Sequence, residues 1–397
     1  MANDTPTIID LDQNATTALH PEVARAMAEC YCAGYANAAS SHRRGREARR
    51  VLEEAREGVG VILGAETSGH LPDQIILTSG GTEANNLALL GLAGSPPGRV
   101  IVSAVEHPSV SGPAEELERR GFDVRRVRVD SSGVVDETHF RELFSADTKL
   151  VSVMLANNET GVLQPVGRLA ELCREAGVPL HTDAVQAVGK IPVNFRQLGV
   201  SALTLTAHKF HGPRGVGAVM LRHGYRLEPV LFGGFHQRAL RPGTESIELA
   251  VGVHRALQVW QRDAQTRLTR MTALRDRFEE LLRGAGLAVT VNGSGAGRLP
   301  HTSNVSFPGL DCQAMHMVLD LAGVACSIGS ACASGAAGPS PVLLAMQLPR
   351  EIVEGALRFS LGAFTTRQDV DVAADRIIEA ARRLRRGRAV DAERSRW

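Results

Sequence analysis

Lysine is scarce in this chain, and one lysine stands in a segment suited to chemistry. Only three of the 44 basic residues are lysines, Lys149, Lys190 and Lys209. Lys209 follows the apolar run Leu203–Thr206 and is flanked by histidines and glycines in AHKFHGPRG. Burial and nearby positive charge lower the pKa of an amine, which imine formation requires, and arginine cannot form an imine. Lys209 is therefore the leading candidate for a Schiff-base lysine, whereas Lys149 has surface-like polar neighbours and Lys190 remains open.

Two of the six cysteines stand close together in CSIGSACASG, in different surroundings. Cys326 follows apolar residues and is expected to be a buried, unreactive thiol. Cys332 stands among small polar residues beside Ala333–Pro341, ASGAAGPSP, a composition typical of a mobile loop. A thiol there could ionise and reach a substrate, although composition alone supports a structural role equally well.

Three further segments place polar residues where predicted strands end. Ser79–Glu83, SGGTE, joins the strand IILT to a helix, and such a glycine turn can hold a phosphate, although many do not. Asp183 ends an apolar strand and is followed by Gln186, so it either caps a helix or lies at the ligand-binding edge of a parallel sheet. His107 follows the strand VIVS, where a buried core histidine is the simpler interpretation and a proton shuttle the alternative.

The pattern of short β-branched runs alternating with amphipathic helices predicts an α/β fold with a largely parallel sheet. At 397 residues the chain exceeds the size of one hydrophobic core, so two domains are expected. The large domain should comprise residues 15–260, and the small domain residues 1–14 and 261–397. The expected strands of the large domain are Ile75–Thr78, Val100–Ser103, Val124–Val129, Leu150–Leu155, Leu180–Asp183, Leu203–Thr206 and Val216–Leu221. A long helix over Ser246–Arg283 should lead into the small domain.

Composition excludes several classes of protein. The formal net charge of +1 favours neither a nucleic-acid nor a membrane partner, and no apolar stretch is long enough to span a bilayer. The first residues do not resemble a secretory signal, so a cytoplasmic protein with free thiols is expected. Cys30, Cys32 and His42 lack the usual zinc spacing, and no metal is expected. The basic run Arg382–Arg388 is interpreted as a solvated helix end.

Taken together, these segments resemble the cysteine desulfurases, a group within the class V aminotransferase-like pyridoxal-phosphate enzymes. The resemblance extends from Leu11 to Thr366 and is carried, in the family's order, by SGGTEANN, EHPSV, NNETGVLQP, HTDAVQAVGK, the Lys209 segment, RPGTES, GSACASG and RFSLG. It implies the fold type I of pyridoxal-phosphate transferases. That fold has a large domain with a mostly parallel seven-stranded sheet and a smaller α+β C-terminal domain.

The resemblance also implies a role for each matching residue. Lys209 would bind pyridoxal 5′-phosphate covalently and act as the base, while His107 stacks on the ring. Asp183 would pair with the pyridine nitrogen and Gln186 with the phenolic oxygen. The remaining residues expected at the cofactor are Gly81, Thr82, Asn158, Thr206, which replaces a common serine, His208 and, from the partner subunit of a homodimer, Thr244. Those expected at the substrate are Asn158, Arg358 as a carboxylate clamp, and Asn37, a weaker candidate because NAASSH departs from the family's run.

The implied reaction converts L-cysteine to L-alanine and leaves a persulfide on Cys332. An acceptor protein then takes the sulfur, and the sequence leaves open whether it serves iron–sulfur cluster assembly, tRNA, DNA or small-molecule thiolation. The long loop resembles that of general sulfur donors. The alternatives are an aminotransferase or selenocysteine lyase, a catalytically silent sulfur-relay protein, and nucleic-acid binding through Arg382–Arg388.

Overall fold

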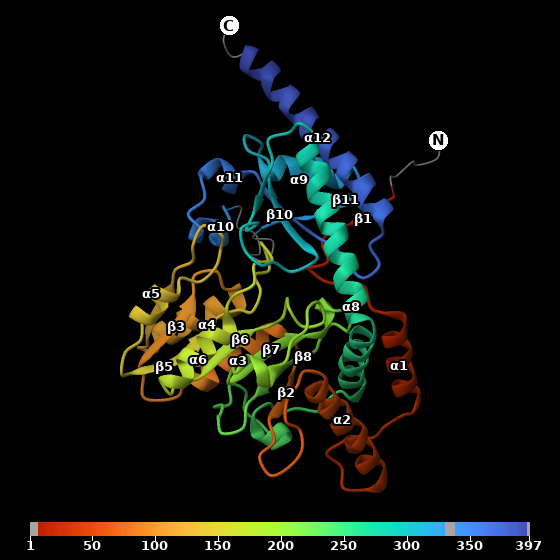
Figure 1. Cartoon of the computed structure of the whole chain (residues 1–397). Coiled ribbons are helices and arrows are strands. Elements are labelled where there is room, and N and C mark those ends of the chain that lie inside the picture. Colours follow the sequence, from red (N-terminus) through yellow and green to blue (C-terminus); the bar gives the residue numbers. More distant parts are fainter. Residues whose placement is uncertain (1–6, 330–337, 395–397) are drawn as a thin grey trace.

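The computed structural model describes residues 7–329 and 338–394, and Figure 1 shows two bodies joined by one long helix. The lower body in this view contains the large sheet. The upper body contains a smaller sheet and both ends of the described chain. The helix α8 (Ile247–Gly284) runs along one side of the molecule and contributes to both bodies.

The large sheet has seven strands in the order β2-β8-β7-β6-β5-β3-β4. All run parallel except β8, which is antiparallel to both of its neighbours. The strands are β2 (Gln74–Thr78), β3 (Arg99–Ser103), β4 (Asp123–Val127), β5 (Thr148–Ser152), β6 (Leu180–Asp183), β7 (Ala202–Thr206) and β8 (Gly217–Leu221). This sheet confirms the predicted mostly parallel seven-stranded α/β architecture, and each predicted strand agrees with an observed one to within three residues at either end.

Helices cover the sheet because its strands are buried and nearly continuously apolar. They are α3 (Gly81–Ala93), α4 (Pro108–Arg119), α5 (Glu137–Glu142), α6 (Val166–Glu175) and α7 (Phe195–Leu198). Two of them start at residues of interest. Gly80 precedes the first turn of α3, and His107 caps α4, with Pro108 at the first helical position, where its missing N–H leaves no bond unmade.

Two N-terminal helices, α1 (Pro21–Cys32) and α2 (Arg43–Ile62), pack against α8. The sequence analysis named only the start of α1, at Pro21, and missed α2, whose first turns are rich in arginine. A β-carbon at Gly58 would lie 2.2 Å from the His254 ring, so glycine permits the close approach of α2 to α8. His42, considered above beside Cys30 and Cys32, accepts a hydrogen bond from the Gly45 amide and caps α2.

The smaller body has a four-stranded antiparallel sheet in the order β12-β13-β10-β9. These strands are β9 (Thr290–Asn292), β10 (Thr302–Ser306), β12 (Ser327–Ile328) and β13 (Ala356–Ser360), while β1 (Ile9–Asp10) pairs in parallel with β11 (Val324–Ala325). Its helices are α9 (Cys312–Leu321), α10 (Pro341–Ala345), α11 (Arg350–Glu354) and α12 (Arg367–Arg394). A separate hydrophobic core joins Leu11 to residues of α8, α9 and α12.

Two local expectations need correction. Pro341 was assigned to a loop, but it opens α10, and Ser340 caps that helix through the Leu343 amide. The run Arg382–Arg388 lies inside α12 and not at its end. Arg382 and Arg385 donate to the carbonyls of Ala285 and Ala288, just beyond the end of α8. These arginines thus complement the C-terminus of a neighbouring helix, which agrees with a structural role.

Candidate active site

The carboxyl ends of the parallel strands surround a cavity of about 400 Å³. Ligands of open α/β sheets bind at this edge because the loops that leave the strands converge there. Nine residues expected at the cofactor line the cavity: Gly81, Thr82, His107, Asn158, Asp183, Gln186, Thr206, His208 and Lys209. The other lining residues are Ala15, Ser109, Met154, Ala156 and Val185. Segments more than a hundred residues apart therefore meet at one site.

The amine of Lys209 lies at the wall between the cavity and the N-terminal segment. Lys209 is in a short 3-10 turn directly after β7, so the strand fixes where its side chain starts. Its Nζ donates to the carbonyl oxygens of Asn14 and Ala15, at 2.7 and 2.8 Å. The amine is thus held near the cavity by two neutral acceptors.

Asp183 is a buried carboxylate at the end of β6 and is held on both oxygens. Its Oδ1 accepts from the Val185 amide at 2.9 Å, and its Oδ2 accepts from Asn85 Nδ2 at 2.7 Å. The first bond is a local turn that fixes the carboxylate against its own backbone. The second comes from the α3 helix and ties the carboxylate to the helix that begins at the glycine turn. Such a fixed anion suits a protonated ring nitrogen.

His107 is connected to Asp183 through side-chain hydrogen bonds. Asn85 Nδ2 also donates to Ser109 Oγ at 2.8 Å, and Ser109 Oγ lies 2.7 Å from His107 Nδ1. The Ser109 amide donates to the same ring nitrogen, so the ring proton of a neutral His107 is on Nε2. Burial lowers the pKa of His107, and the Lys209 amine lowers it further, against an opposing effect of Asp183. His107 is therefore a neutral ring at pH 7, suited to stacking and to proton transfer at Nε2.

The opposite end of the cavity carries donors for an anion. Gly81 and Thr82 form the first turn of α3, where free backbone N–H groups and the helix dipole favour negative charge. A β-carbon at Gly81 would lie 3.1 Å from Val185 Cγ2, so glycine keeps this wall open. The Thr206 hydroxyl already donates to the Val216 carbonyl at 2.8 Å and is left as an acceptor. Burial lowers the pKa of His208 to about 4, with a further contribution from Lys209.

The expected substrate residues lie in different places. Asn158 lines the cavity. Arg358 is buried, with one terminal nitrogen on Asp12 at 2.8 Å and the other on the Asn158 carbonyl at 3.2 Å. The Arg358 Nε is buried without a hydrogen-bond partner among the described residues. Arg358 is not one of the residues that line the cavity, so it lies behind the site, beside Asn158.

Besides Arg358, two expected site residues do not line the cavity, and a third lies outside the described residues. Asn37 is exposed, its side chain accepts from the Ala39 amide, and it does not line the cavity. Thr244 is also exposed and outside the lining. Cys332 lies outside the described residues. Cys326 is buried between β11 and β12, and burial raises the pKa of its thiol to about 12, in line with the expected unreactive role.

The structure also reveals polar residues at the site that the sequence analysis did not single out. Asn85, Ser109 and Glu106 stand close to residues with an expected role, in SGGTEANN and EHPSV, whereas Asn14 stands in the segment LDQNATT at Leu11, where no residue had been given a role. Glu106 accepts from the Ser103 hydroxyl and from the Met154 amide. Burial raises its pKa to about 8, and the nearby Asp183 adds to this rise, so the carboxyl is largely protonated at pH 7. Their position beside known motifs was the available signal.

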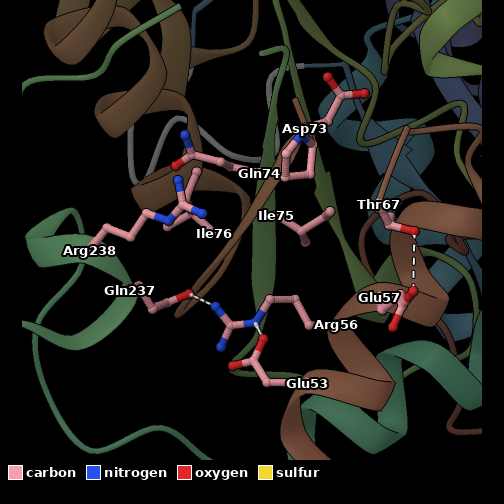
Figure 2. A pocket seen from close by; sticks show the side chains of 11 residues that line it. Glu53, Arg56, Glu57, Thr67, Asp73, Gln74, Ile75, Ile76, Gln237 and Arg238 are labelled. Atoms are coloured by element: carbon pink, nitrogen blue, oxygen red, sulfur yellow. Dashed lines mark hydrogen bonds and ion pairs between the residues drawn. The ribbon is translucent and has the colours of Figure 1, made fainter. Parts of the chain in front are cut away.

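A second cavity, of about 240 Å³, lies beside the edge strand β2 and lacks this chemistry (Figure 2). Its lining includes Arg56, which bonds to Glu53 and Gln237, but no lysine, histidine or cysteine. The Gln237 amide bonds both the N–H and the carbonyl of Leu77 and so caps the open edge of β2. Gln237, Arg238 and Ala239 have φ values of 48°, 59° and 63°, a left-handed backbone that costs these residues energy.

The chain belongs to the class-V aminotransferase family, whose model matches residues 9–372. Within that family its similarity is to cysteine desulfurases. Cysteine desulfurase IscS of Dictyoglomus turgidum is 40% identical, across 94% of this chain and 95% of that protein. A solved NifS-like protein superposes with a TM-score of 0.86 at 33% identity, over 94% of this chain and 99% of that one. SspA, solved in complex with cysteine, gives a TM-score of 0.77 at 28% identity, over 90% and 99%.

Proposed function

We propose that this protein is a cysteine desulfurase that works with pyridoxal phosphate. The observation that carries the proposal is the convergence of Lys209, Asp183 and His107 on one cavity at the edge of the parallel sheet. Family membership supports the enzyme class, since the curated relatives across nearly the whole chain are cysteine desulfurases. The structure of SspA with cysteine is a fold relative consistent with this substrate.

The residues around the cavity fit this cofactor at each of its polar groups. A primary amine, Lys209, can react with an aldehyde, and the buried carboxylate of Asp183 can pair with a ring N–H. The cavity wall stays open at Gly81 because glycine has no side chain, and the first turn of α3 offers free backbone N–H groups. Both features suit a phosphate. Gln186 offers an amide to a ring oxygen. We therefore assign the cofactor to this cavity, with Thr82, Thr206, His208 and Asn158 around it.

Each residue then has a defined task. When bound, the cofactor supplies an electron sink for bond breaking at the substrate α-carbon. Lys209 would hold the cofactor through its side-chain amine and, whenever that amine is free, would accept the proton of the substrate α-carbon. His107 is neutral with its proton on Nε2 and could exchange that proton with a substrate held at the cofactor ring. Asn158 would contact the substrate at the cavity, and Arg358 would clamp the substrate carboxylate only after exchanging its bonds to Asp12 and to the Asn158 carbonyl.

Cys332 is assigned the sulfur-accepting step. Its thiolate attacks the substrate sulfur, so that an S–S bond forms as the carbon–sulfur bond breaks. The electron pair of that bond stays with the three-carbon skeleton, which takes up a proton and leaves as alanine. The thiol of Cys332 is thereby oxidised to a persulfide and the carbon skeleton is reduced, without another oxidant.

We further propose a homodimer in which Thr244 reaches the phosphate of the other subunit. Thr244 is exposed, and its segment is tethered on both sides, since Arg241 pairs with Glu83 and Glu245 with Arg56. Phe232 and Phe235 in the preceding segment are 86% and 92% exposed, a large apolar surface for a single subunit. The division into domains 15–260 and 1–14 with 261–397, a cytoplasmic location, and a role in iron–sulfur cluster assembly remain predictions. Among the described helices, none has the length and apolar character needed to cross a bilayer.

The test is product formation from L-cysteine by the purified holoprotein with a thiol reductant. We expect alanine and sulfide in equal amounts, with activity abolished in Lys209→Ala and Cys332→Ser and retained in the control Lys149→Ala. An aminotransferase would instead require a keto-acid acceptor and would keep its turnover in Cys332→Ser. That result would overturn the proposal.

A further inference from the structure

Behind the cavity, Asn14 is the centre of a buried hydrogen-bond network that joins both bodies of the molecule. Its backbone carbonyl accepts from Lys209 Nζ at 2.7 Å and from Gln186 Nε2 at 3.2 Å. Its side-chain oxygen accepts from Lys190 Nζ at 3.1 Å and lies 2.9 Å from His301 Nε2. Lys190 also donates to Gln186 Oε1 at 2.9 Å. Lys190 is thus linked to Lys209 and to Gln186 through the same residue.

Lys190 determines which end of the Gln186 amide faces the cofactor site. The Lys190 amine donates to the Gln186 oxygen, and the Asn14 carbonyl, which can only accept, bonds the Gln186 nitrogen, so both contacts fix the same orientation of the amide. The NH₂ group of Gln186 is then turned toward Asn14 and the cavity, where it is available as a donor. Without Lys190, only the 3.2 Å bond to the Asn14 carbonyl would oppose a rotation that presents the Gln186 oxygen to an anionic ring oxygen, a repulsive contact.

The charges around Lys190 agree with an anionic partner that comes from a bound ligand and not from the described part of the chain. Among the described residues, no carboxylate forms an ion pair with Lys190. The charged groups that act on it are Lys209 and Arg358, and burial together with these two lowers its pKa. Burial lowers the pKa of His301 and His211, which share a small cavity of about 40 Å³ with Lys190, so neither ring adds charge at pH 7. An anionic oxygen beyond Gln186 would favour the ammonium form of Lys190 against burial and against Lys209 and Arg358.

We propose that Lys190 is a positioning residue, which fixes the donor end of Gln186 toward the ring oxygen of the bound cofactor and so sets the protonation of that cofactor. This inference rests on the proposed function. Lys190 touches neither cofactor nor substrate in this scheme, and it acts through Gln186 and Asn14. A purely structural role, in which Lys190 only ties Asn14 to the large sheet, predicts different spectroscopic results.

The test uses the holoprotein of Lys190→Met, with Lys149→Met as the matched control, because Lys149 lies on β5 away from the site. The first readout is the pH dependence of the visible absorbance of the bound cofactor. We expect its midpoint to rise by about one unit in Lys190→Met, because a positive donor that opposes protonation is lost. The second readout is cofactor affinity by dialysis of the apoprotein, which should fall about tenfold in this variant. Lys149→Met should match the wild type in both.

Two more variants keep the inference falsifiable if Lys190→Met does not fold. Lys190→Arg retains a charged donor, and the adjacent small cavity leaves room for it, so the midpoint should stay near that of the wild type. Lys190→Gln keeps a donor without charge and should give an intermediate shift. A folded Lys190→Met or Lys190→Gln with a wild-type midpoint and affinity would overturn the inference. Wild-type protein that binds no cofactor would instead refute the proposed function itself.

Discussion

The side-chain amine of Lys209 donates to the backbone carbonyl of Asn14 at 2.7 Å, although the two residues are 195 positions apart in the chain. The same amine donates to the Ala15 carbonyl at 2.8 Å. The N-terminal segment therefore closes one wall of the site and holds the reactive amine in place. The two carbonyls hold the amine at the wall of the cavity, within reach of a bound aldehyde.

The covalent role of Lys209 can be tested by borohydride reduction of the holoprotein followed by peptide mapping. Reduction fixes the bond between a lysine amine and the aldehyde of the cofactor. We expect the label in the peptide that contains Lys209, and no label in Lys209→Ala. Since the chain has only three lysines, the assignment is simple. A label on Lys149 or Lys190 in the wild type would contradict the site.

For the rate of the reaction, the negative charge of Asp183 should matter more than the shape of its side chain. Asp183→Asn preserves the size of the side chain and keeps one oxygen for the Val185 amide, and Asn85 can turn its unpartnered Oδ1 toward the new NH₂ group. The substitution removes the anion that pairs with the ring nitrogen. We expect kcat to fall by about 100-fold or more, a magnitude typical for the loss of one fixed electrostatic partner. Steady-state kinetics with L-cysteine measures this. Asp276→Asn, an exposed control, should have no effect, and equal kcat values in both variants would argue against the pairing.

Glu106 should make stability depend on pH. Burial raises its pKa from 4.5 in the unfolded reference to about 8, so between these values the folded chain keeps a proton that the unfolded chain releases. The free energy of unfolding should therefore fall as the pH rises through this window, by at most about 5 kcal/mol from this group. Glu106→Gln, which cannot ionise, should lose less stability between pH 5 and pH 8.

Urea unfolding at several pH values measures the difference. Glu54→Gln serves as the control, since Glu54 is 59% exposed and, among the residues that the structure describes, forms its ion pair with Arg50 in the same helix. Burial also raises the pKa of Glu159, to about 7, and its contribution has the same sign and is common to all three proteins. Parallel stability curves for wild type and Glu106→Gln would show that the carboxyl is ionised in the folded protein.

Local sequence patterns predicted the sheet, whereas for the residues at its edge they left alternatives open that the family resemblance decided. Asp183 ends its strand, and Lys209 and His107 stand within four residues of the end of theirs; parallel strands bring such ends together. The helix α2 was missed because its first turns are arginine-rich and its apolar face becomes evident only against α8. The two-residue strands β1 and β11 pair across more than three hundred residues, and no local pattern reports such a contact.

The network behind the site was beyond sequence reasoning for the same reason. Lys190 could not be assigned from its neighbours, since its partners Asn14 and Gln186 are brought together only when the N-terminal segment crosses the sheet edge. Likewise, Arg358 was expected as a substrate clamp, but its pairing with Asp12 was not foreseen. Polar contacts between distant segments depend on the assembled fold and leave no periodic trace in the chain.

The most direct measurement of the central claim is mass spectrometry of the purified holoprotein after a short incubation with L-cysteine and no reductant. We expect the peptide that contains Cys332 to gain the mass of one sulfur atom, with alanine released in proportion, and Cys332→Ser to show neither. The peptides with Cys326 and Cys173 should stay unmodified, because burial raises the pKa of both thiols to about 12. Alanine formation without added sulfur on Cys332, or sulfur on another cysteine, would contradict the account.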